Sequence, residues 1–332
     1  MNTSRLFKIF ALSVLVLTGV CANAQNRIEK LRADYDSLGN VSGAYLFPKE
    51  KGANLRILDM NVWEWDGTRD KLPPAWAAIG EDCTNEVRSI GFAGIITAHL
   101  PEVVCLQEYS PEMHLELYPK LQKAGYQITF LPGPDEVNFT PILYLKSRVK
   151  LLETAYYPHA LPYNNGRTKS FTTAVFQMKK GGKKFIVANT HLWWKSEKVM
   201  AGSDNARTQQ VRNIIAEAAK LRQKYECPVF FMGDLNCNLR SEALKVALAA
   251  DYKPAWEIAT VHGDLRCGHH KCDKGGFSRK ENKTSDGFGC IDHFFIYDPA
   301  GSVEVKTFMR DYAWFTVKLT DHYPNYADIV LK

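Results

Sequence analysis

The chain has 332 residues, of which 45% are hydrophobic and 12% aromatic, and its formal charge at pH 7 is +6. This composition suits a globular protein with a sizeable core. It contains no fixed-period repeat, low-complexity tract or long Pro/Ser linker, so we expect one domain rather than a repeat array. The mild positive charge fits a phosphate-bearing substrate, but surplus lysine is commonly just a solvated surface and does not by itself indicate nucleic acid.

Residues 1–24 have the pattern of a secretory signal peptide. Arg5 and Lys8 precede an apolar run, and Ala22-Asn23-Ala24 offers a cleavage site flanked by small residues. The apolar run is too short to span a bilayer comfortably, and no later segment has the length of a span. We therefore expect cleavage after Ala24 and a secreted or periplasmic protein, monomeric and without a stable membrane span.

Residues 25–53 show little periodicity and are interpreted as an N-terminal extension, and residues 54–332 as a single domain. Apolar periodicity, capping residues and turn residues define the elements of that domain. In chain order we predict a strand over 55–62, a helix over 84–99, a strand over 103–106, a helix over 110–125, strands over 126–131 and 141–146, strands over 172–178 and 184–189 joined as a hairpin, a helix over 205–225, a strand over 229–232, a helix over 241–250, and strands over 290–297 and 326–331.

Long loops are expected over 158–170 and 262–289. The first holds Arg167 and Lys169, which are candidates for contact with a substrate phosphate, although cations on loops are commonplace. The second is rich in Gly, Lys and Cys. Its Cys267-Gly-His-His-Lys-Cys272 segment lacks the two separated ligand pairs of a structural zinc site, so a disulfide or free thiols are favoured.

Seven cysteines remain after the signal, and the odd number leaves at least one unpaired. Export would permit disulfides, and Cys267 with Cys272 is the favoured pair. Cys105 and Cys290 lie in apolar, strand-like runs, so we expect both to behave as small buried hydrophobes.

The apolar run Val229–Met232 is the central strand of the pattern. It breaks at Gly233 and is followed by Asp234 and Asn236, which lie two residues apart and would project to the same side of an extended chain. Polar groups at the end of a strand that is buried from water cost free energy unless they are hydrogen-bonded or bind a ligand. A tight turn is the alternative interpretation, because Gly, Asp and Asn are all turn formers.

The same arrangement recurs along the chain, because polar side chains flank several other apolar strands. These residues are Asn61, Glu108, His191, Asp292, Asp321 and His322. Carboxylates together with an asparagine suit a hard cation such as Mg²⁺ or Mn²⁺. Histidines with a neighbouring aspartate suit phosphate binding and proton transfer. Neither a Gly-x-Ser-x-Gly elbow nor a Gly-x-x-x-x-Gly-Lys phosphate loop is present in the sequence.

Taken in order, these motifs resemble those of the endonuclease/exonuclease/phosphatase superfamily, which has the deoxyribonuclease-I-like fold. The motifs are Leu-Asp-Met-Asn61, Leu-Gln-Glu108, Asn-Thr-His191-Leu, Gly-Asp234-Leu-Asn236, Ile-Asp292-His-Phe and Asp321-His322-Tyr-Pro. The resemblance runs from about Leu55 to the C-terminus. It implies an α/β fold, namely a four-layer α/β/β/α sandwich of two packed mixed, mainly antiparallel sheets, with the site at one end.

The resemblance also implies roles for the metal-binding and water-activating residues. Glu108 would bind the divalent cation, expected to be Mg²⁺ with Mn²⁺ as an alternative, helped by Asn61 and supported by Asp321. Asp234 would orient or deprotonate the attacking water. A cation over the phosphate oxygens would offset the charge that grows in the transition state.

The remaining motif residues would handle the phosphate. The resemblance implies that Asn236 holds the scissile phosphate and that His191 contacts it or assists the leaving group. His322 would bind or protonate a phosphate oxygen, oriented and kept cationic by Asp292, because a carboxylate beside an imidazole raises its pKa.

The motifs favour a secreted phosphodiesterase that is a nuclease. The Gly-Cys-Ile-Asp292-His segment departs from the Pro-Ala-Trp-Cys-Asp-Arg pattern of inositol phosphatases, which disfavours that branch. Asn-Thr-His-Leu-Trp-Trp followed by Arg207-x-x-Gln210 is similar to the deadenylase-type and secreted bacterial-type branches, which makes Arg207 a candidate substrate-binding residue.

Two alternatives remain open to test. The first is a sphingomyelinase-like phospholipase or a phosphomonoesterase, for which an apolar loop containing Trp63, Trp65, Trp193 or Trp194 could serve as a lipid-facing rim. The second is a binding module that has kept the fold without catalysis. It is disfavoured because every metal and base position is filled.

Overall fold

The computed structural model describes residues 48–64, 84–129, 139–164, 169–262, 290–310 and 319–332. The predicted signal peptide, Trp65, Arg167 and the Cys267–Cys272 segment lie outside these residues. In the part of the chain that is described, no helix is long and apolar enough to cross a bilayer.

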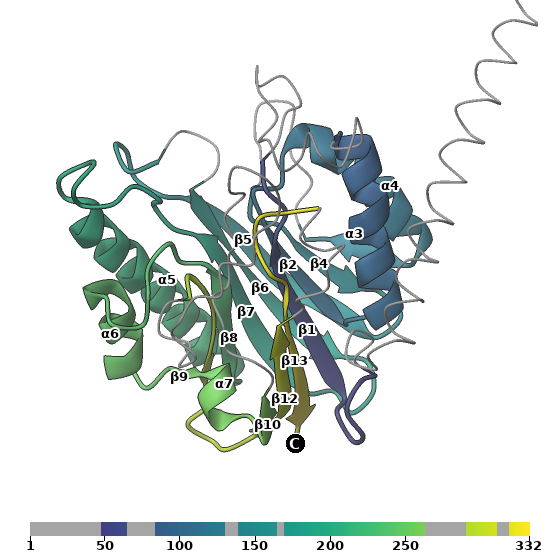
Figure 1. Ribbon diagram of the computed structural model, residues 1–332. Coiled ribbons are helices and arrows are strands. Elements are labelled where there is room, and N and C mark those ends of the chain that lie inside the picture. Colours follow the sequence, from purple (N-terminus) through teal and green to yellow (C-terminus); the bar gives the residue numbers. More distant parts are fainter. Residues whose placement is uncertain (1–47, 65–83, 130–138, 165–168, 263–289, 311–318) are drawn as a thin grey trace, which may run out of the picture.

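Two sheets pack face to face (Figure 1). The seven-stranded sheet has the order β10 (Val261–His262), β12 (Val303–Arg310), β13 (Asn325–Leu331), β1 (Leu55–Asn61), β2 (Val103–Gln107), β4 (Ile142–Leu145) and β3 (Tyr126–Ile128). The six-stranded sheet has the order β5 (Val149–Pro158), β6 (Ser170–Met178), β7 (Lys184–His191), β8 (Val229–Asp234), β11 (Asp292–Tyr297) and β9 (Lys253–Pro254).

Both sheets are mixed and mainly antiparallel, as predicted. The parallel pairs among the described strands are β1 with β2, β7 with β8, and β10 with β12. The first and last long strands of the domain are neighbours, since β13 pairs with β1 in an antiparallel ladder. This pairing brings the Asp321-His322 segment, just before β13, to the end of the sheet where β1 finishes.

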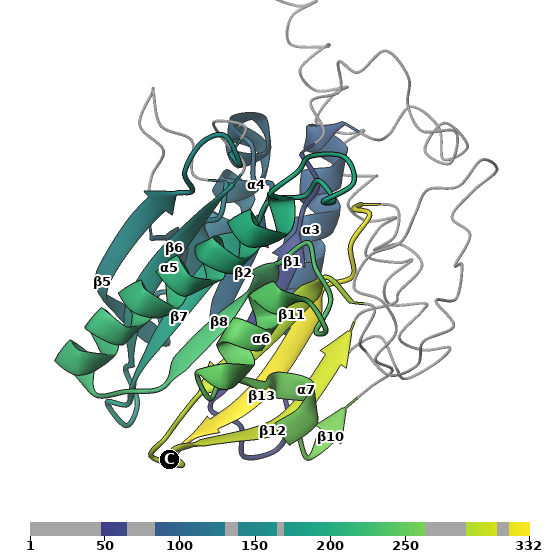
Figure 2. The ribbon, with the colours of Figure 1, turned by 90° about the vertical axis from the view of Figure 1, so that its left-hand side faces the viewer.

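Helices cover the outer faces of the two sheets. The helices α3 (Asn85–His99) and α4 (Pro111–Lys123) lie on the seven-stranded sheet, and α5 (Ser203–Tyr225) and α6 (Glu242–Ala249) lie on the six-stranded sheet (Figures 1 and 2). The short helix α7 (Ala255–Ile258) follows β9. The result is the predicted four-layer α/β/β/α sandwich.

The helix boundaries follow from capping chemistry. The Ser110 hydroxyl accepts a hydrogen bond from the Met113 N–H at 3.1 Å, and Pro111 occupies the first turn of α4, where its missing N–H costs nothing. Ser241 caps α6 in the same way, accepting from the Leu244 N–H at 3.3 Å. The predicted helices over 110–125 and 241–250 begin at these two serines.

Three apolar clusters hold the layers together, one between the sheets and one beneath each helical layer. Strand β8 contributes to two of them, because successive side chains of a strand point to opposite faces. Phe230 and Met232 lie between the sheets, whereas Val229 and Phe231 pack under α5 and α6. Burial on both faces therefore explains the continuous apolar run in this strand.

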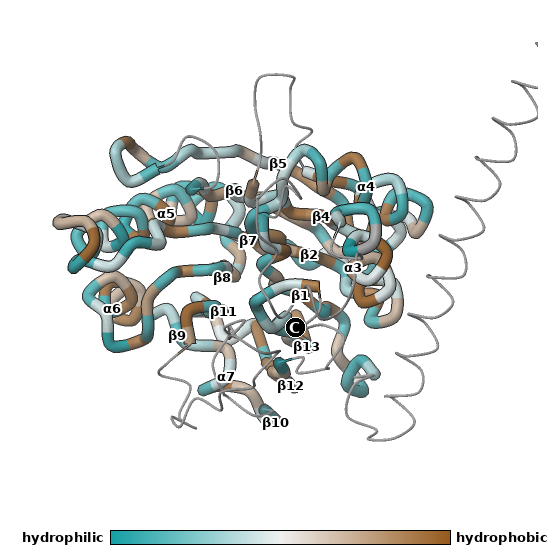
Figure 3. Tube along the Cα trace, turned by 45° about the horizontal axis from the view of Figure 1, so that its top comes forward, coloured by the Kyte–Doolittle hydropathy of each residue, from teal (hydrophilic) through white to brown (hydrophobic). Residues whose placement is uncertain are grey.

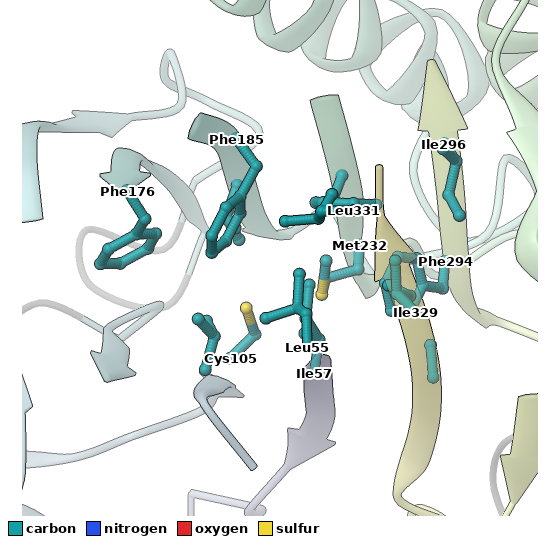
Figure 4. Close-up of a cluster of buried hydrophobic side chains, with 14 of the residues drawn as sticks. Leu55, Ile57, Cys105, Phe176, Phe185, Met232, Phe294, Ile296, Ile329 and Leu331 are labelled. Atoms are coloured by element: carbon teal, nitrogen blue, oxygen red, sulfur yellow. The ribbon is translucent and has the colours of Figure 1, made fainter. Parts of the chain in front are cut away.

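The cluster between the sheets is built from large aliphatic and aromatic side chains of both sheets (Figure 4). It includes Cys105, which is fully buried, as is Cys290 nearer the site. The tube in Figure 3 shows apolar residues concentrated on the central strands, with hydrophilic residues on the outer turns of the helices. The expectation of a buried hydrophobe is confirmed for Cys105, whereas the buried Cys290 contacts a polar group, the Arg310 guanidinium.

Several elements were not predicted. Strand β5 falls in a stretch that the sequence left unassigned, and most of its residues are half-buried, so it shows no clean alternation. Strand β12 is interrupted by a bulge between Val305 and Thr307, which breaks the period of two. The elements β9, β10 and α7 are too short to give a periodic signal.

Candidate functional site

The site lies at one end of the central strands, where the side chains that face the space between the two sheets change from apolar to polar. In β8 the column between the sheets runs Phe230, Met232 and then Asp234. The neighbouring columns end in the same way, and together they supply Asn61 from β1, His191 from β7 and Asp292 from β11. The strand ends meet at one end of the sandwich, so residues far apart in sequence converge there (Figure 1).

A buried polar layer separates this site from the apolar core beneath it. The Gln107 side-chain amide donates to Asp59 Oδ1 at 2.8 Å and, across the gap between the sheets, to Asn189 Oδ1 at 2.7 Å. The Asn189 amide in turn donates to the Leu106 and Pro141 carbonyl oxygens at 2.8 and 2.9 Å. These bonds fix the spacing of the two sheets directly below the site.

Asp234 is the centre of the site. Its Oδ2 accepts a hydrogen bond from Asn61 Nδ2 at 3.1 Å, and it lies 3.3 Å from His191 Nε2 and 3.7 Å from His322 Nε2. Asn61 Nδ2 also donates to Glu108 Oε1 at 3.1 Å, and that oxygen lies 3.7 Å from His191 Nε2. The predicted residues Asn61, Glu108, His191 and Asp234 are therefore in mutual contact.

His322 and Asp292 form a second pair beside Asp234. His322 Nδ1 lies 2.8 and 3.0 Å from the two Asp292 carboxylate oxygens, which leaves Nε2 directed at Asp234 and Asp321. The three carboxylates raise the pKa of His322 well above its usual value, against the opposing effect of burial. His322 is therefore an imidazolium at neutral pH, as the Asp292 pairing predicted.

The turn after β8 bears out the tight-turn interpretation of Asp234 and Asn236. Asp234 Oδ1 accepts a hydrogen bond from the Asn236 N–H at 3.0 Å, which closes a tight turn. The expectation that the two residues continue an extended chain is wrong, because β8 ends at Asp234 and Asn236 has a φ of 49°. Asn236 Nδ2 donates instead to the Leu192 carbonyl at 3.0 Å, tying this turn to the segment after His191.

Lys169 also belongs to the site, although a loop cation is too common in sequences to indicate one. It is 3% exposed, and its ammonium contacts both ring nitrogens of His191, 3.1 Å from Nδ1. The register of the hairpin, which pairs Phe171 with Thr190, puts Ser170 opposite His191 and Lys169 one residue beyond it, so the strand pattern did not single out this contact.

Charges within the site shift several pKa values. Burial lowers the pKa of Lys169 to about 8 against the attraction of Glu108 and Asp234. Burial and the Lys169 charge lower the pKa of His191. Burial alone would raise the pKa of Asp234, but the neighbouring His191 and His322 lower it overall. Asp234 is thus ionised, and His191 is neutral, at neutral pH.

A further buried cation lies behind Asp292. Arg310 is 3% exposed, and its Nε donates to Asn325 Oδ1 at 2.8 Å. Its terminal nitrogens contact Cys290 Sγ at 2.5 Å and the Asp292 carbonyl at 3.4 Å. No sequence pattern indicated Arg310, because it lies on β12, a strand that was not predicted.

One of the predicted substrate-binding residues, Arg207, is not brought into this cluster. Arg207 is buried on α5, where it donates to the carbonyl oxygens of Trp193 and Lys195 and pairs with Asp204. It supports the segment after His191. Arg167 lies outside the described residues, so its predicted contact with a phosphate stays a prediction.

The donor set fits a divalent metal ion. Ligand atoms of Glu108, His191 and Asp234 lie within 4.8 Å of one another, and so do those of Asp234, Asp292 and His322. Asp321 Oδ1 is buried without a hydrogen-bond partner, which leaves a carboxylate oxygen for a cation. Ionised carboxylates are the ligands that Mg²⁺ or Mn²⁺ prefers.

The orientation of Asn61 bears on its predicted ligand role. Its Oδ1 accepts a hydrogen bond from the Trp63 N–H at 2.8 Å, and its Nδ2 faces the carboxylates of Glu108 and Asp234. In this arrangement Asn61 spaces and orients two carboxylates. Supplying an oxygen to a metal would require its amide to turn over.

Comparison with known proteins agrees with this geometry. The sequence model of the Endonuclease/Exonuclease/phosphatase family matches residues 80–322. The chain is 26% identical over 186 residues to Tyrosyl-DNA phosphodiesterase 2 of Danio rerio, an alignment that spans 55% of this chain and only 46% of that protein.

Solved structures show the same fold. An endonuclease/exonuclease/phosphatase from Bacteroides vulgatus has a TM-score of 0.61 at 21% identity, covering 84% of this chain and 99% of that one. A mannosyl-6-phosphatase from Bacteroides thetaiotaomicron has a TM-score of 0.59 at 15% identity, covering 83% and 99% of the two chains. At these identities the likeness concerns the fold alone.

Proposed function

Because this chain belongs to the endonuclease/exonuclease/phosphatase family, whose members hydrolyse phosphoesters, we propose that it is a divalent-metal-dependent phosphodiesterase that acts on nucleic acid. One observation carries the proposal. Asp234 lies between Glu108, His191 and an imidazolium, His322, so that a base, a cation-binding carboxylate and an acid converge on one point. In-line attack by water on a phosphodiester needs these three functions together.

Each side chain of the site has a role that follows from its protonation state. The ionised Asp234 accepts a proton from, or orients, the attacking water. His322, held cationic by Asp292, donates a hydrogen bond from Nε2 to a phosphate oxygen or a proton to the leaving oxygen. Lys169 supplies a fixed positive charge beside the neutral His191, where negative charge builds on the phosphoryl oxygens.

The carboxylate of Glu108 and the unpartnered oxygen of Asp321 would hold the metal ion, with Mg²⁺ as the proposed species. When bound, such an ion polarises a phosphoryl oxygen and lowers the pKa of water. Glu108 is prepared for this role, since His191 and Lys169 outweigh the effect of burial and lower its pKa.

The deciding experiment compares substrates at one metal concentration. We expect the purified protein to hydrolyse single-stranded DNA or RNA oligonucleotides in Mg²⁺ and to lose this activity in EDTA. Asp234→Asn should reduce kcat by roughly 10³-fold or more, because the base is replaced by a neutral amide. Asp251→Asn, on the exposed loop after α6, is the matched control and should retain full activity. Absence of hydrolysis of any phosphodiester would contradict the proposal.

A phosphomonoesterase is the second candidate, favoured by the likeness in fold to a mannosyl-6-phosphatase and by the buried Lys169 cation. A terminal phosphate carries more negative charge than a diester and would benefit more from this cation. Release of inorganic phosphate from sugar phosphates, at rates exceeding oligonucleotide cleavage, would favour this candidate. The sphingomyelinase-like alternative is tested by sphingomyelin vesicles in the same assay.

We also propose export, which rests on the signal-peptide pattern of residues 1–24. N-terminal sequencing of protein recovered from outside the cytoplasm should begin at Gln25. Recovery of the intact N-terminus from the cytoplasm would contradict this proposal.

A further inference from the structure

The segment that follows β7 presents one tryptophan to solvent and buries the other. Trp193 is 4% exposed, its Nε1 donates to Ser203 Oγ at 3.2 Å, and its ring meets Tyr163 edge-on at 5.9 Å. Trp194 is 54% exposed. Trp193 is therefore core material, whereas the Trp194 indole is available to a ligand.

The backbone that carries Trp194 is pinned on both sides. Arg207 donates to the carbonyl oxygens of Trp193 and Lys195, at 2.9 and 2.7 Å. The Glu197 carboxylate accepts from the Gly202 and Asp204 N–H groups, at 2.7 and 2.9 Å. An exposed indole on a fixed backbone binds at a low entropic cost, because little is ordered on binding.

Trp194 is also close to the reacting groups. Leu192 is tied to the turn that carries Asp234, since its N–H donates to the Asp234 carbonyl at 2.9 Å and its carbonyl accepts from Asn236 Nδ2. Two residues of extended chain span at most about 7 Å. The Trp194 backbone therefore lies within about 7 Å of Leu192, which is hydrogen-bonded to the turn that carries Asp234.

A cation accompanies the exposed ring. Lys195 Nζ lies 5.5 Å from the centroid of the Trp194 ring and 5.7 Å from that of Trp193. An indole face beside an ammonium suits a base and its phosphate. A lipid-inserting loop would need a continuous apolar surface. Here Lys195, Ser196, Glu197 and Lys198 separate Trp194 from Val199, the next exposed apolar residue.

We propose that Trp194 and Lys195 form a stacking platform for the unpaired base adjacent to the scissile phosphate, so that the substrate class is single-stranded nucleic acid. Paired bases in a duplex already stack on their neighbours, and only an unpaired base offers a free face to Trp194. This inference rests on the proposed phosphodiesterase function and specifies its substrate.

The kinetic test compares an oligothymidylate 12-mer with a 12-mer of the same backbone that lacks bases. Trp194→Ala should raise KM for oligothymidylate roughly ten-fold or more, with little change in kcat, because one base–aromatic stack is lost. Cleavage of the abasic oligomer should be unchanged. Trp194→Phe should restore most of the affinity. Leu115 on α4 is also an exposed apolar residue, so Leu115→Ala is the control and should leave KM and kcat for both oligomers unchanged.

A binding measurement keeps the test independent of turnover. Polarisation of fluorescein-labelled oligothymidylate, measured in the Asp234→Asn background, should show the same loss of affinity with Trp194→Ala. Lys195→Gln should reduce the slope of log K against log [salt] by about one, because one cation no longer contacts a phosphate.

The outcomes separate this inference from the proposed function. Equal KM values for Trp194→Ala and wild type on oligothymidylate, with turnover intact, would overturn the platform alone. So would an effect of Trp194→Ala confined to sphingomyelin vesicles. No turnover of any phosphodiester, with base-dependent binding retained, would overturn the proposed function and leave the platform standing.

Discussion

The charge state of Lys169 sets an upper pH limit on the site. Burial lowers the pKa of its ammonium to about 8, so the side chain is a cation below that pH and neutral above it. We expect kcat/KM to fall as the pH rises through about 8, because the charge that faces the phosphate is lost. Lys169→Arg should move this fall to higher pH, since a guanidinium stays charged. A pH–rate profile from 6 to 10 measures both.

Two further variants test the same assignment. Lys169→Met should lower kcat/KM by about 10²-fold at pH 7 and remove the alkaline fall. Lys220→Met, an exposed cation on α5, should behave as wild type. An alkaline fall that is identical in wild type and Lys169→Arg would show that another group titrates there.

Gly233 is required by a close approach of two strands. Its φ is 137°, and a Cβ at this position would clash with the carbonyl oxygen of Thr190 on β7. We expect Gly233→Ala to lower the free energy of unfolding by more than about 2 kcal/mol and to displace Asp234. Gly94→Ala in α3, where a Cβ meets nothing within 4 Å, should be neutral or stabilising by up to about 1 kcal/mol. Urea unfolding of the two variants provides the comparison.

At the scale of elements, the sequence predicted those strands and helices that have a local pattern of apolar and polar residues. The buried strand β1 was found from its alternation, and β2, β7, β8, β11 and β13 were found because each is an apolar run flanked by polar residues. The strand β12 was missed because a bulge breaks its period. The contact of Lys169 with His191 depends on hairpin register, and that of Arg310 with Asp292 depends on strand order. Neither is a local property of the sequence.

The polar layer beneath the site gives a prediction about how the sheets are joined. Asn189→Ala would remove its hydrogen bonds to the carbonyl oxygens of Leu106 and Pro141 and the acceptor of part of the Gln107 amide, although the Pro141 carbonyl would keep the hydrogen bond from the Leu106 N–H. We expect a loss of about 2–5 kcal/mol in the free energy of unfolding. Asn213→Ala on the exposed face of α5 should cost less than about 0.5 kcal/mol. A small effect at Asn189 would show that water replaces its hydrogen bonds.

At the scale of the whole molecule, metal binding should appear as stability. An ion that binds only the folded chain stabilises it by about 2.7 kcal/mol when present at 100 times its dissociation constant. We therefore expect Mg²⁺ to raise Tm and EDTA to reverse the rise. Glu108→Gln should remove most of this shift, and Glu226→Gln, at the C-cap of α5, should keep it. Calorimetry with and without Mg²⁺ decides the matter, and a shift that persists in Glu108→Gln would place the ion elsewhere.

The pairing of β13 with β1 has a consequence for biosynthesis. Strand β13 follows the other described strands in the chain, yet it lies between β12 and β1 in its sheet, and Asp321 and His322 immediately precede it. A chain from which β13 has not yet emerged would have neither a completed seven-stranded sheet nor the proposed acid. We therefore expect the sheet and the site to form together, late in the synthesis of the domain.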